Sequence, residues 1–197
     1  MEQNKLSFTF KMLRRMGFNY SEEEYGQVSL WKVVGKFFHN IHTAFLCKMM
    51  NWAILEPFAP RKVRPYLMRK MGCHVGKGCF IGDNVKIDTG HADMITLEDG
   101  VSVAGGTRLL CHQRDFSEYF VGSDYNKLRY SIKPIVLKKG CLIGMESFVL
   151  PGVTVGEGAI VGAGSLVVKD IPAWTVATGR PAKVVREIPQ RPRNNMF

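Results

Sequence analysis

The sequence has no apolar run long enough to cross a bilayer, because its longest uncharged stretch, 37–47, is well short of the ~20 residues required. It also lacks paired cysteines, since none of its 5 cysteines stands in a C-x-x-C pair. An odd cysteine count without a secretory signal indicates free thiols in a reducing compartment, so we expect a cytoplasmic protein. No zinc-finger spacing, RNP-like strand or basic zipper is present, which argues against a nucleic-acid partner.

The chain does contain enough apolar side chains for a folded core. Hydrophobic residues make up 46% of its 197 residues and charged residues 22%, as in globular rather than disordered chains. This length predicts one domain, or one domain with an added subdomain. The net charge is +10, and the first 70 residues carry 12 basic against 5 acidic side chains. Such a balance is typical of proteins that bind anionic lipids or phosphorylated ligands.

Residues 1–71 are predicted to form a helical N-terminal region. Apolar side chains recur every three or four positions over 29–55, and lysines and histidines fill the other face. This helix is expected to end at Glu56-Pro57, because the residue before a proline avoids the helical region. A second, shorter helix is expected to follow and to stop at Gly72.

Two interpretations of this helical region stay open. It is either a subdomain packed on the rest of the chain or a basic amphipathic surface that contacts an anionic membrane. A dense basic cluster after the apolar helix favours the membrane, although such clusters are usually only solvated. Its members are Arg61, Lys62, Arg64, Arg69 and Lys70. On the second interpretation the protein is peripheral at the inner face of the membrane.

From Val75 the sequence repeats with a period of six residues. Each unit starts with an aliphatic residue and carries a small residue four places later. The units start at Val75, Ile81, Leu97, Val103, Leu137, Ile143, Val149, Val155 and Val161. A period of six is too short for a helix pair and fits a parallel β-helix in which three flat strands make one triangular coil. The aliphatic residues are expected to point inward and stack from coil to coil.

The small positions of the repeat are expected at tight corners of the coil. Cys79 and Cys141 occupy such positions, so we interpret them as small apolar packing residues rather than metal ligands or nucleophiles. The repeat breaks after Ile87 and, at greater length, over 113–134. Long loops on a rigid scaffold tend to carry function. The aromatic and charged residues of this loop suit sugar recognition or packing on a neighbouring subunit.

The pattern [LIV]-[GAED]-x-x-[STAV]-x resembles the repeat of the hexapeptide acyltransferases, which form a left-handed parallel β-helix. The segment VLPGVTVGEGAIVGAGSLVVKDIP (149–172) and the tail ATGRPAKVVR (177–186) are similar to the branch of galactoside, maltose and nodulation-type O-acetyltransferases. The resemblance covers 74–188. It implies a mainly β fold, with the β-helix domain at 72–188 and a C-terminal tail at 189–197. Residues 1–71 do not match the short N-terminal segment of the maltose-type enzymes. The resemblance therefore does not imply that this protein acts on the substrate of those enzymes.

The resemblance also implies an activity. Such enzymes use acetyl-CoA or another acyl-CoA as donor and work as homotrimers with active sites between subunits. We expect an acetyltransferase that acts on a hydroxyl or amino group of a sugar in surface polysaccharide biosynthesis. Its essential histidine precedes the loop that leaves the helix, which is His112 here. The spacing departs from the galactoside-type enzymes, because His112 lies three residues rather than five after the inward Leu109.

An acetyl transfer needs a group that removes the acceptor's proton, and a histidine suits this role near neutral pH. The resemblance assigns His112 as that general base and the backbone N–H of Met145 as the donor to the oxyanion. It also assigns backbone contacts with the pantetheine arm to Gly144 and Ala163. The expected phosphate-binding residues are Lys169, Arg180, Lys183 and Arg186. The expected acceptor-binding residues are Asp88, His91, Asp93 and Tyr119, and either Asp88 or Asp93 is a candidate to orient His112.

Three other functions are compatible with a hexapeptide repeat. A serine acetyltransferase-like enzyme shares the repeat, but the tail Gly179-Arg-Pro-Ala favours the galactoside branch. A γ-type carbonic anhydrase needs two histidines five residues apart, and none are so spaced, so no metal is expected. A scaffold without activity is the third alternative, and the presence of His112 and Lys169 argues against it.

Overall fold

The computed structural model describes residues 6–17 and 26–190. The chain divides into two compact units, Met1–Ala44 and Phe45–Phe197. The first unit contains α1 (Phe8–Arg15) and most of α3 (Leu30–Met49). Helix α1 begins where the Ser7 hydroxyl accepts a hydrogen bond of 3.2 Å from the N–H of Phe10, so one of its unpaired amides is capped.

Helix α3 ends at Met49, several residues before the predicted end at Glu56-Pro57. The chain turns here because the next two residues bind elsewhere. The Met50 carbonyl accepts a hydrogen bond of 2.8 Å from Arg64 Nε, and the Asn51 side chain accepts one of 2.7 Å from the N–H of Asn84. Tertiary contacts therefore outweigh the helical pattern over 50–55.

A 3₁₀ turn (Ala53–Leu55), a π-helical turn (Ala59–Val63) and α4 (Arg64–Lys70) complete the helical region. Gly72 follows α4 with φ of +110°, a conformation that residues with a side chain rarely adopt. Its N–H donates a hydrogen bond of 3.0 Å to the backbone carbonyl of Arg69. The predicted stop at Gly72 is confirmed.

Three parallel sheets build the rest of the second unit. The first holds β1 (His74–Val75), β4 (Ile95–Leu97), β9 (Ile135–Leu137) and β12 (Thr154–Val155). The second holds β2 (Phe80–Ile81), β5 (Ser102–Val103), β10 (Leu142–Ile143), β13 (Ile160–Val161) and β15 (Thr175–Gly179), with β16 (Ala182–Glu187) antiparallel at its edge. The third holds β3 (Lys86–Ile87), β6 (Arg108–Leu109), β11 (Phe148–Val149) and β14 (Leu166–Val167).

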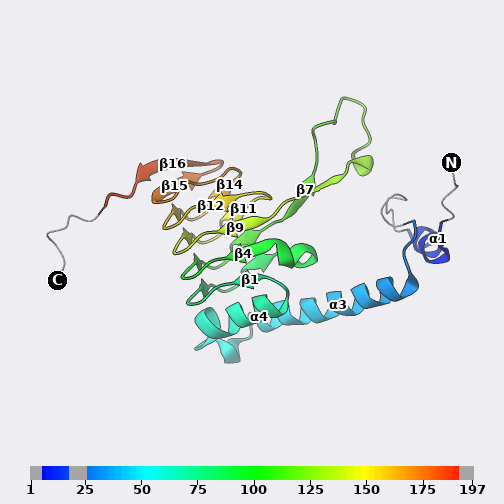
Figure 1. Ribbon diagram of the computed structural model, residues 1–197, viewed down its shortest axis with the longest axis horizontal. Helices are drawn as coiled ribbons and strands as arrows, with labels where there is room; N and C mark the ends of the chain where they lie inside the picture. Colours follow the sequence, from blue (N-terminus) through cyan, green and yellow to red (C-terminus); the bar gives the residue numbers. More distant parts are fainter. Residues whose placement is uncertain (1–5, 18–25, 191–197) are drawn as a thin grey trace. The chain divides into compact units, whose positions relative to one another are not determined.

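Apart from the antiparallel pair of β15 and β16, consecutive strands of the coils belong to different sheets, and strands of successive coils pair in parallel. Ile81, for example, lies opposite Val103, and Val103 lies opposite Ile143. Figure 1 shows the coils stacked from β1 at one end to β15 and β16 at the other. This is the mainly β coil that the six-residue period predicts.

The aliphatic positions of the repeat fill the interior of the coils, as predicted. The fully buried ones are Ile81, Leu97, Val103, Leu109, Leu137, Ile143, Val149, Val155, Val161 and Val167. The small corner residues are buried as well, and polar ones bond to the next coil, as when Ser147 Oγ donates to the Gly162 carbonyl at 3.1 Å. Burial raises the pKa of the Cys141 thiol to about 12, which agrees with a packing role.

Helix α4 covers the β1 end of the stack (Figure 1). Its Arg64 is only 2% exposed and reaches the first coil, where Nη1 donates to the Ile81 carbonyl at 3.3 Å, while Nη2 pairs with Glu56. Side chains on both sides of the predicted boundary at 71/72 belong to one buried cluster, among them Leu46, Met50, Leu67, Met68, Met71 and Ile81. The predicted helical region therefore extends over both compact units, because residues 45–71 pack on the first coil.

The interruption at 113–134 is a β-hairpin, where the sequence predicted only a loop. Strand β7 (His112–Arg114) pairs antiparallel with β8 (Tyr130–Ile132), and the hairpin projects from the coils (Figure 1). The Arg114 guanidinium lies 4.1 Å from the centre of the Tyr130 ring, which holds the two strands together on one face. At the C-terminus, residues 191–197 of the predicted tail lie outside the described residues.

Candidate active site

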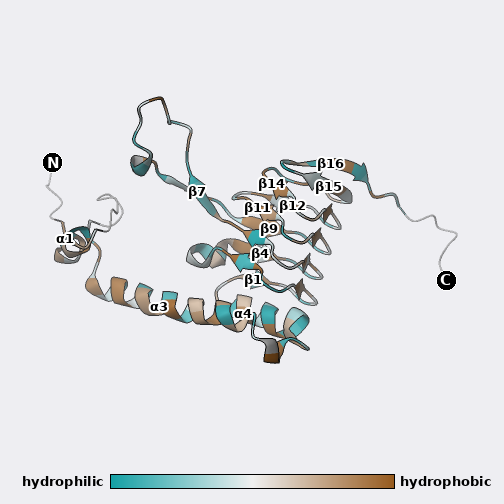
Figure 2. Cartoon of the chain, turned by 180° about the vertical axis from the view of Figure 1, so that it is seen from behind, coloured by the Kyte–Doolittle hydropathy of each residue, from teal (hydrophilic) through white to brown (hydrophobic). Residues whose placement is uncertain are grey.

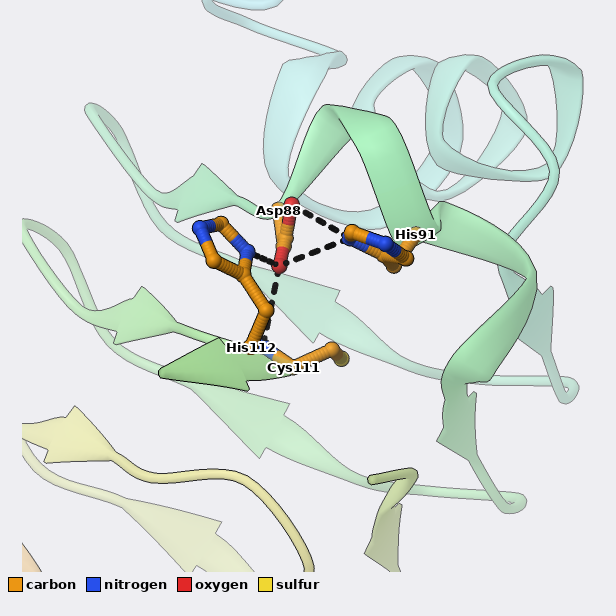
Figure 3. A network of polar contacts seen from close by, with 4 residues as sticks. All are labelled: Asp88, His91, Cys111 and His112. Atoms are coloured by element: carbon orange, nitrogen blue, oxygen red, sulfur yellow. Dashed lines mark hydrogen bonds and ion pairs between the residues drawn. The ribbon is translucent and has the colours of Figure 1, made fainter. Parts of the chain in front are cut away.

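His112 and Asp88 meet because two strands of the third sheet pair in register. Ile87 lies opposite Leu109, and the N–H of Asp88 donates to the Leu109 carbonyl at 3.0 Å. Asp88 directly follows β3, and on the next coil the chain leaves β6 at the same corner. His112, which begins the hairpin, therefore lies beside Asp88. Nδ1 of His112 bonds to the carboxylate of Asp88 (Figure 3).

The carboxylate of Asp88 is the centre of this cluster. Its side chain is 5% exposed, and besides His112 it accepts from Nδ1 of His91 at 3.3 Å and from the backbone N–H of Cys111 at 3.2 Å. Burial alone would raise the pKa of Asp88, but the hydrogen bonds and charges of His112 and His91 outweigh it and lower this pKa. Asp88 is therefore ionised at neutral pH.

An ionised carboxylate only accepts hydrogen bonds, so Nδ1 of His112 carries the proton in this pair. When the ring is neutral, Nε2 then holds the free lone pair. The side chain of His112 is 40% exposed, so it is accessible to a substrate. The cluster can thus orient a histidine as a base, with Asp88 as the residue that fixes its tautomer. Cys111, the neighbour of His112, is fully buried, and burial raises the pKa of its thiol to about 12, which agrees with the sequence-based expectation that it is not a nucleophile.

Asp88→Asn is expected to lower kcat about 10- to 100-fold with little change in the KM for acetyl-CoA. An amide can donate to Nδ1 of His112 and so favour the tautomer whose Nε2 already carries the proton. Steady-state kinetics of the pure protein measure both constants. The exposed Asp83→Asn is the matched control, and an equal loss in both variants would contradict the assignment of Asp88.

The structure separates the two carboxylates that the sequence left as alternatives for orienting His112. Asp88 bonds to His112, whereas Asp93 is exposed further along the 3₁₀ segment Thr89–Met94. Among the hairpin aromatics, the ring of Tyr130 lies 5.5 Å from that of His112. Tyr119 packs edge-on against Phe116, with 6.1 Å between ring centres, and its predicted contact with the acceptor stays a prediction. Tyr130 comes near His112 through the pairing of β7 with β8, which lies outside the six-residue repeat and so could not be predicted from it.

Three of the predicted cofactor-binding residues, Gly144, Ala163 and Arg180, lie at a different corner of the coil from His112. Gly144 follows β10 of the second sheet, and a Cβ on it would lie 2.5 Å from the backbone N of Ala163, so only glycine fits. Arg180 reaches this corner, where its Nη1 donates to the Gly164 carbonyl at 3.4 Å. Met145 lies next to Gly144, and its side chain is exposed. Within one chain, the expected oxyanion donor therefore lies at another corner than His112.

The remaining predicted phosphate ligands are all exposed. Lys169 follows β14, so it lies on the corner that His112 shares, on a later coil. Lys183 and Arg186 belong to β16 at the edge of the second sheet. These three roles stay predictions.

Comparison with known proteins bears on this site. The family model "Bacterial transferase hexapeptide (six repeats)" matches residues 134–169. A protein of Escherichia coli named as colanic acid biosynthesis acetyltransferase WcaF is 34% identical over 139 residues, which are 63% of this chain and 74% of that protein. The galactoside O-acetyltransferase of Lactococcus lactis is 34% identical over 138 residues, 62% of this chain and 66% of that enzyme.

A solved structure shows the same fold over most of the chain. It is a hexapeptide-repeat acetyltransferase, VCA0836 of Vibrio cholerae, in complex with acetyl coenzyme A. It superposes with a TM-score of 0.56 at 20% identity, over 94% of this chain and 100% of that one. The chain spans 53% to 74% of the length of the first curated relatives that it matches. By its repeat, its fold and these relatives, the chain belongs to the hexapeptide acetyltransferase family.

Proposed function

We propose that this protein transfers an acetyl group from acetyl-CoA to a hydroxyl or amino group of a sugar. The observation that carries the proposal is the Asp88–His112 pair at the root of the hairpin, in a chain of this family. The names of the relatives from L. lactis and E. coli, a galactoside O-acetyltransferase and a colanic acid biosynthesis acetyltransferase, support a sugar acceptor in surface polysaccharide biosynthesis.

In the proposed reaction, Nε2 of His112 accepts the proton of the acceptor while its oxygen or nitrogen attacks the thioester carbon. The carbonyl oxygen becomes an oxyanion, to which the N–H of Met145 donates. The carbon–sulfur bond then breaks, and the imidazolium returns its proton to the thiolate of CoA. Asp88 stabilises the imidazolium between these two steps, because it remains ionised beside Nδ1.

We further propose that the β-helix is left-handed and that three chains form a trimer. In one chain His112 and Met145 lie at different corners of the coil, so base and oxyanion donor would meet only where two subunits face each other. The backbone at Gly144 and Ala163 is the proposed contact for the pantetheine arm. Arg180, Lys169, Lys183 and Arg186 are the proposed partners of the phosphates.

A panel of acceptors tests the function. Purified full-length protein is mixed with acetyl-CoA and, in separate reactions, with sugars, amino sugars, nucleotide sugars and serine, and acetylated products are identified by mass spectrometry. We expect a product with one class of sugar. A product with serine alone would favour the serine acetyltransferase-like alternative. Failure to bind acetyl-CoA would support a scaffold without activity.

We also propose a peripheral location at the inner face of a membrane. Figure 2 shows α3 as mainly hydrophobic, and its exposed apolar side chains are Leu30, Trp31, Phe37, Phe38, Ile41 and Phe45. Over 6–17 and 26–190, no helix combines the length and apolar character that a membrane span needs. Exposed aromatics and surrounding lysines suit binding parallel to an anionic surface.

Vesicle binding is expected to depend on anionic lipid. The protein should co-sediment with vesicles that contain phosphatidylglycerol, and binding should fall as salt rises, because the basic residues are screened. The double variant Trp31→Ser and Phe38→Ser should weaken binding to these vesicles. The control, Tyr119→Ser and Phe120→Ser in the hairpin, should leave this binding unchanged. Equal binding to neutral vesicles, or no binding, would contradict this location.

A further inference from the structure

Asp88, His91 and His112 bring three metal-binding groups to one point. Each offers one ligand atom, and these atoms all lie within 4.8 Å of one another. In Figure 3 both rings turn a nitrogen toward the same carboxylate. Two imidazoles and one carboxylate form a ligand set of zinc sites that keep an open fourth position. Bonds of about 2.0–2.2 Å in a tetrahedron place ligand atoms about 3.3 Å apart, so small side-chain movements close this set around an ion.

We propose that Zn²⁺ binds Asp88, His91 and His112 and thereby inhibits the enzyme. The binding follows from the geometry, while the inhibition rests on the acetyl transfer proposed above. The site differs from the catalytic zinc of a carbonic anhydrase, against which the sequence argues, because here the ion competes with the function of the histidine.

The inhibition follows from the two nitrogens of the His112 ring. Zinc bound to Nδ1 uses the lone pair of that nitrogen, so the single proton of the neutral ring moves to Nε2. The ring then has no lone pair with which to accept the acceptor's proton. Zinc also takes the carboxylate of Asp88, which otherwise holds the proton on Nδ1. The protein gains and loses no proton, since each ring keeps one.

The surroundings favour entry and retention of an ion. The carboxylate is nearly buried and held in place by the Cys111 amide, so one anionic ligand is already oriented. The side chains of His91 and His112 are 29% and 40% exposed, which leaves a path from solvent. Their rings lie 5.3 Å apart between centres and come from separate segments, the 3₁₀ turn and the hairpin. An ion would therefore link the hairpin to the coil below it.

Calorimetric titration of untagged, EDTA-treated full-length protein with ZnCl₂ tests the site. We expect one tight binding event per chain, weakened about tenfold or more by His91→Ala. The matched control is the double variant His39→Ala and His42→Ala, which removes two exposed histidines one turn apart on α3. This variant should bind as the unaltered protein does. Thermal unfolding checks that His91→Ala is folded.

The inhibition is measured with the acceptor that the panel identifies. The acetylated product is detected by mass spectrometry, because zinc binds the free thiol of CoA and would disturb a thiol assay. Zinc should inhibit the unaltered protein at concentrations about tenfold below those needed for His91→Ala. If zinc binding disappears in the double variant His39→Ala and His42→Ala but persists in His91→Ala, zinc does not bind at Asp88, His91 and His112. Binding at the site without loss of rate overturns the inhibition. A protein inactive with every acceptor refutes the proposed function, while calorimetry still decides the metal site.

Discussion

Alanine at His112 is expected to lower the rate of acetyl transfer by about 10²- to 10⁴-fold, the contribution of a positioned general base. The variant keeps the coil intact, because the side chain lies at its surface beside Asp88 and Tyr130. Binding of acetyl-CoA should be nearly unchanged, since His112 is not among its proposed contacts. Product formation at saturating acetyl-CoA, together with the KM for acetyl-CoA, measures both effects.

The matched control for this experiment is His74→Ala. His74 is an exposed histidine on β1, the first strand, and belongs to no proposed contact. It should retain the rate of the unaltered protein. A rate that survives in His112→Ala would mean that another group accepts the proton, and the assignment of the base would be wrong.

Arg64→Met is expected to lower the free energy of unfolding by about 2–4 kcal/mol. Methionine keeps much of the volume, but the carbonyls of Met50 and Ile81 lose their hydrogen-bond donor inside the fold. Glu56 loses its partner too, although its half-exposed carboxylate can be hydrated. Urea unfolding followed by far-UV circular dichroism gives the difference.

Lys62→Met, at an exposed position in the preceding π-helical turn, is the control and should change the stability by no more than about 0.5 kcal/mol. If both variants unfold at the same urea concentration as the unaltered protein, Arg64 does not secure the helix to the first coil.

The coils could be predicted from the sequence because each position of the repeat has one environment. An inward aliphatic residue such as Ile143 and a corner residue such as Ser147 see the same neighbours on every coil, so the pattern survives over the whole domain. The end of α3 at Met49 could not be predicted, because it depends on Arg64, which lies far along the chain.

The site was predictable in part. His112 stood out because it precedes the interruption, but its partner Asp88 is 24 residues away, and the break at 88–96 hides the register between their coils. Only the pairing of Ile87 with Leu109 shows that Asp88, and not Asp93, lies beside His112. The hairpin has no repeat at all, so the approach of Tyr130 to His112 depends on antiparallel pairing that periodicity does not encode.

The stack of coils also has two ends, and open strand edges there would recruit the edges of other molecules into fibres. Helix α4 lies over β1 and β2 at one end, and the antiparallel β16 closes the second sheet at the other. Loss of α4 from the stack would therefore open the strand edges of the first coil to another molecule. The helical segment 45–71 thus protects the protein against association through these edges, besides any role that the residues before it have.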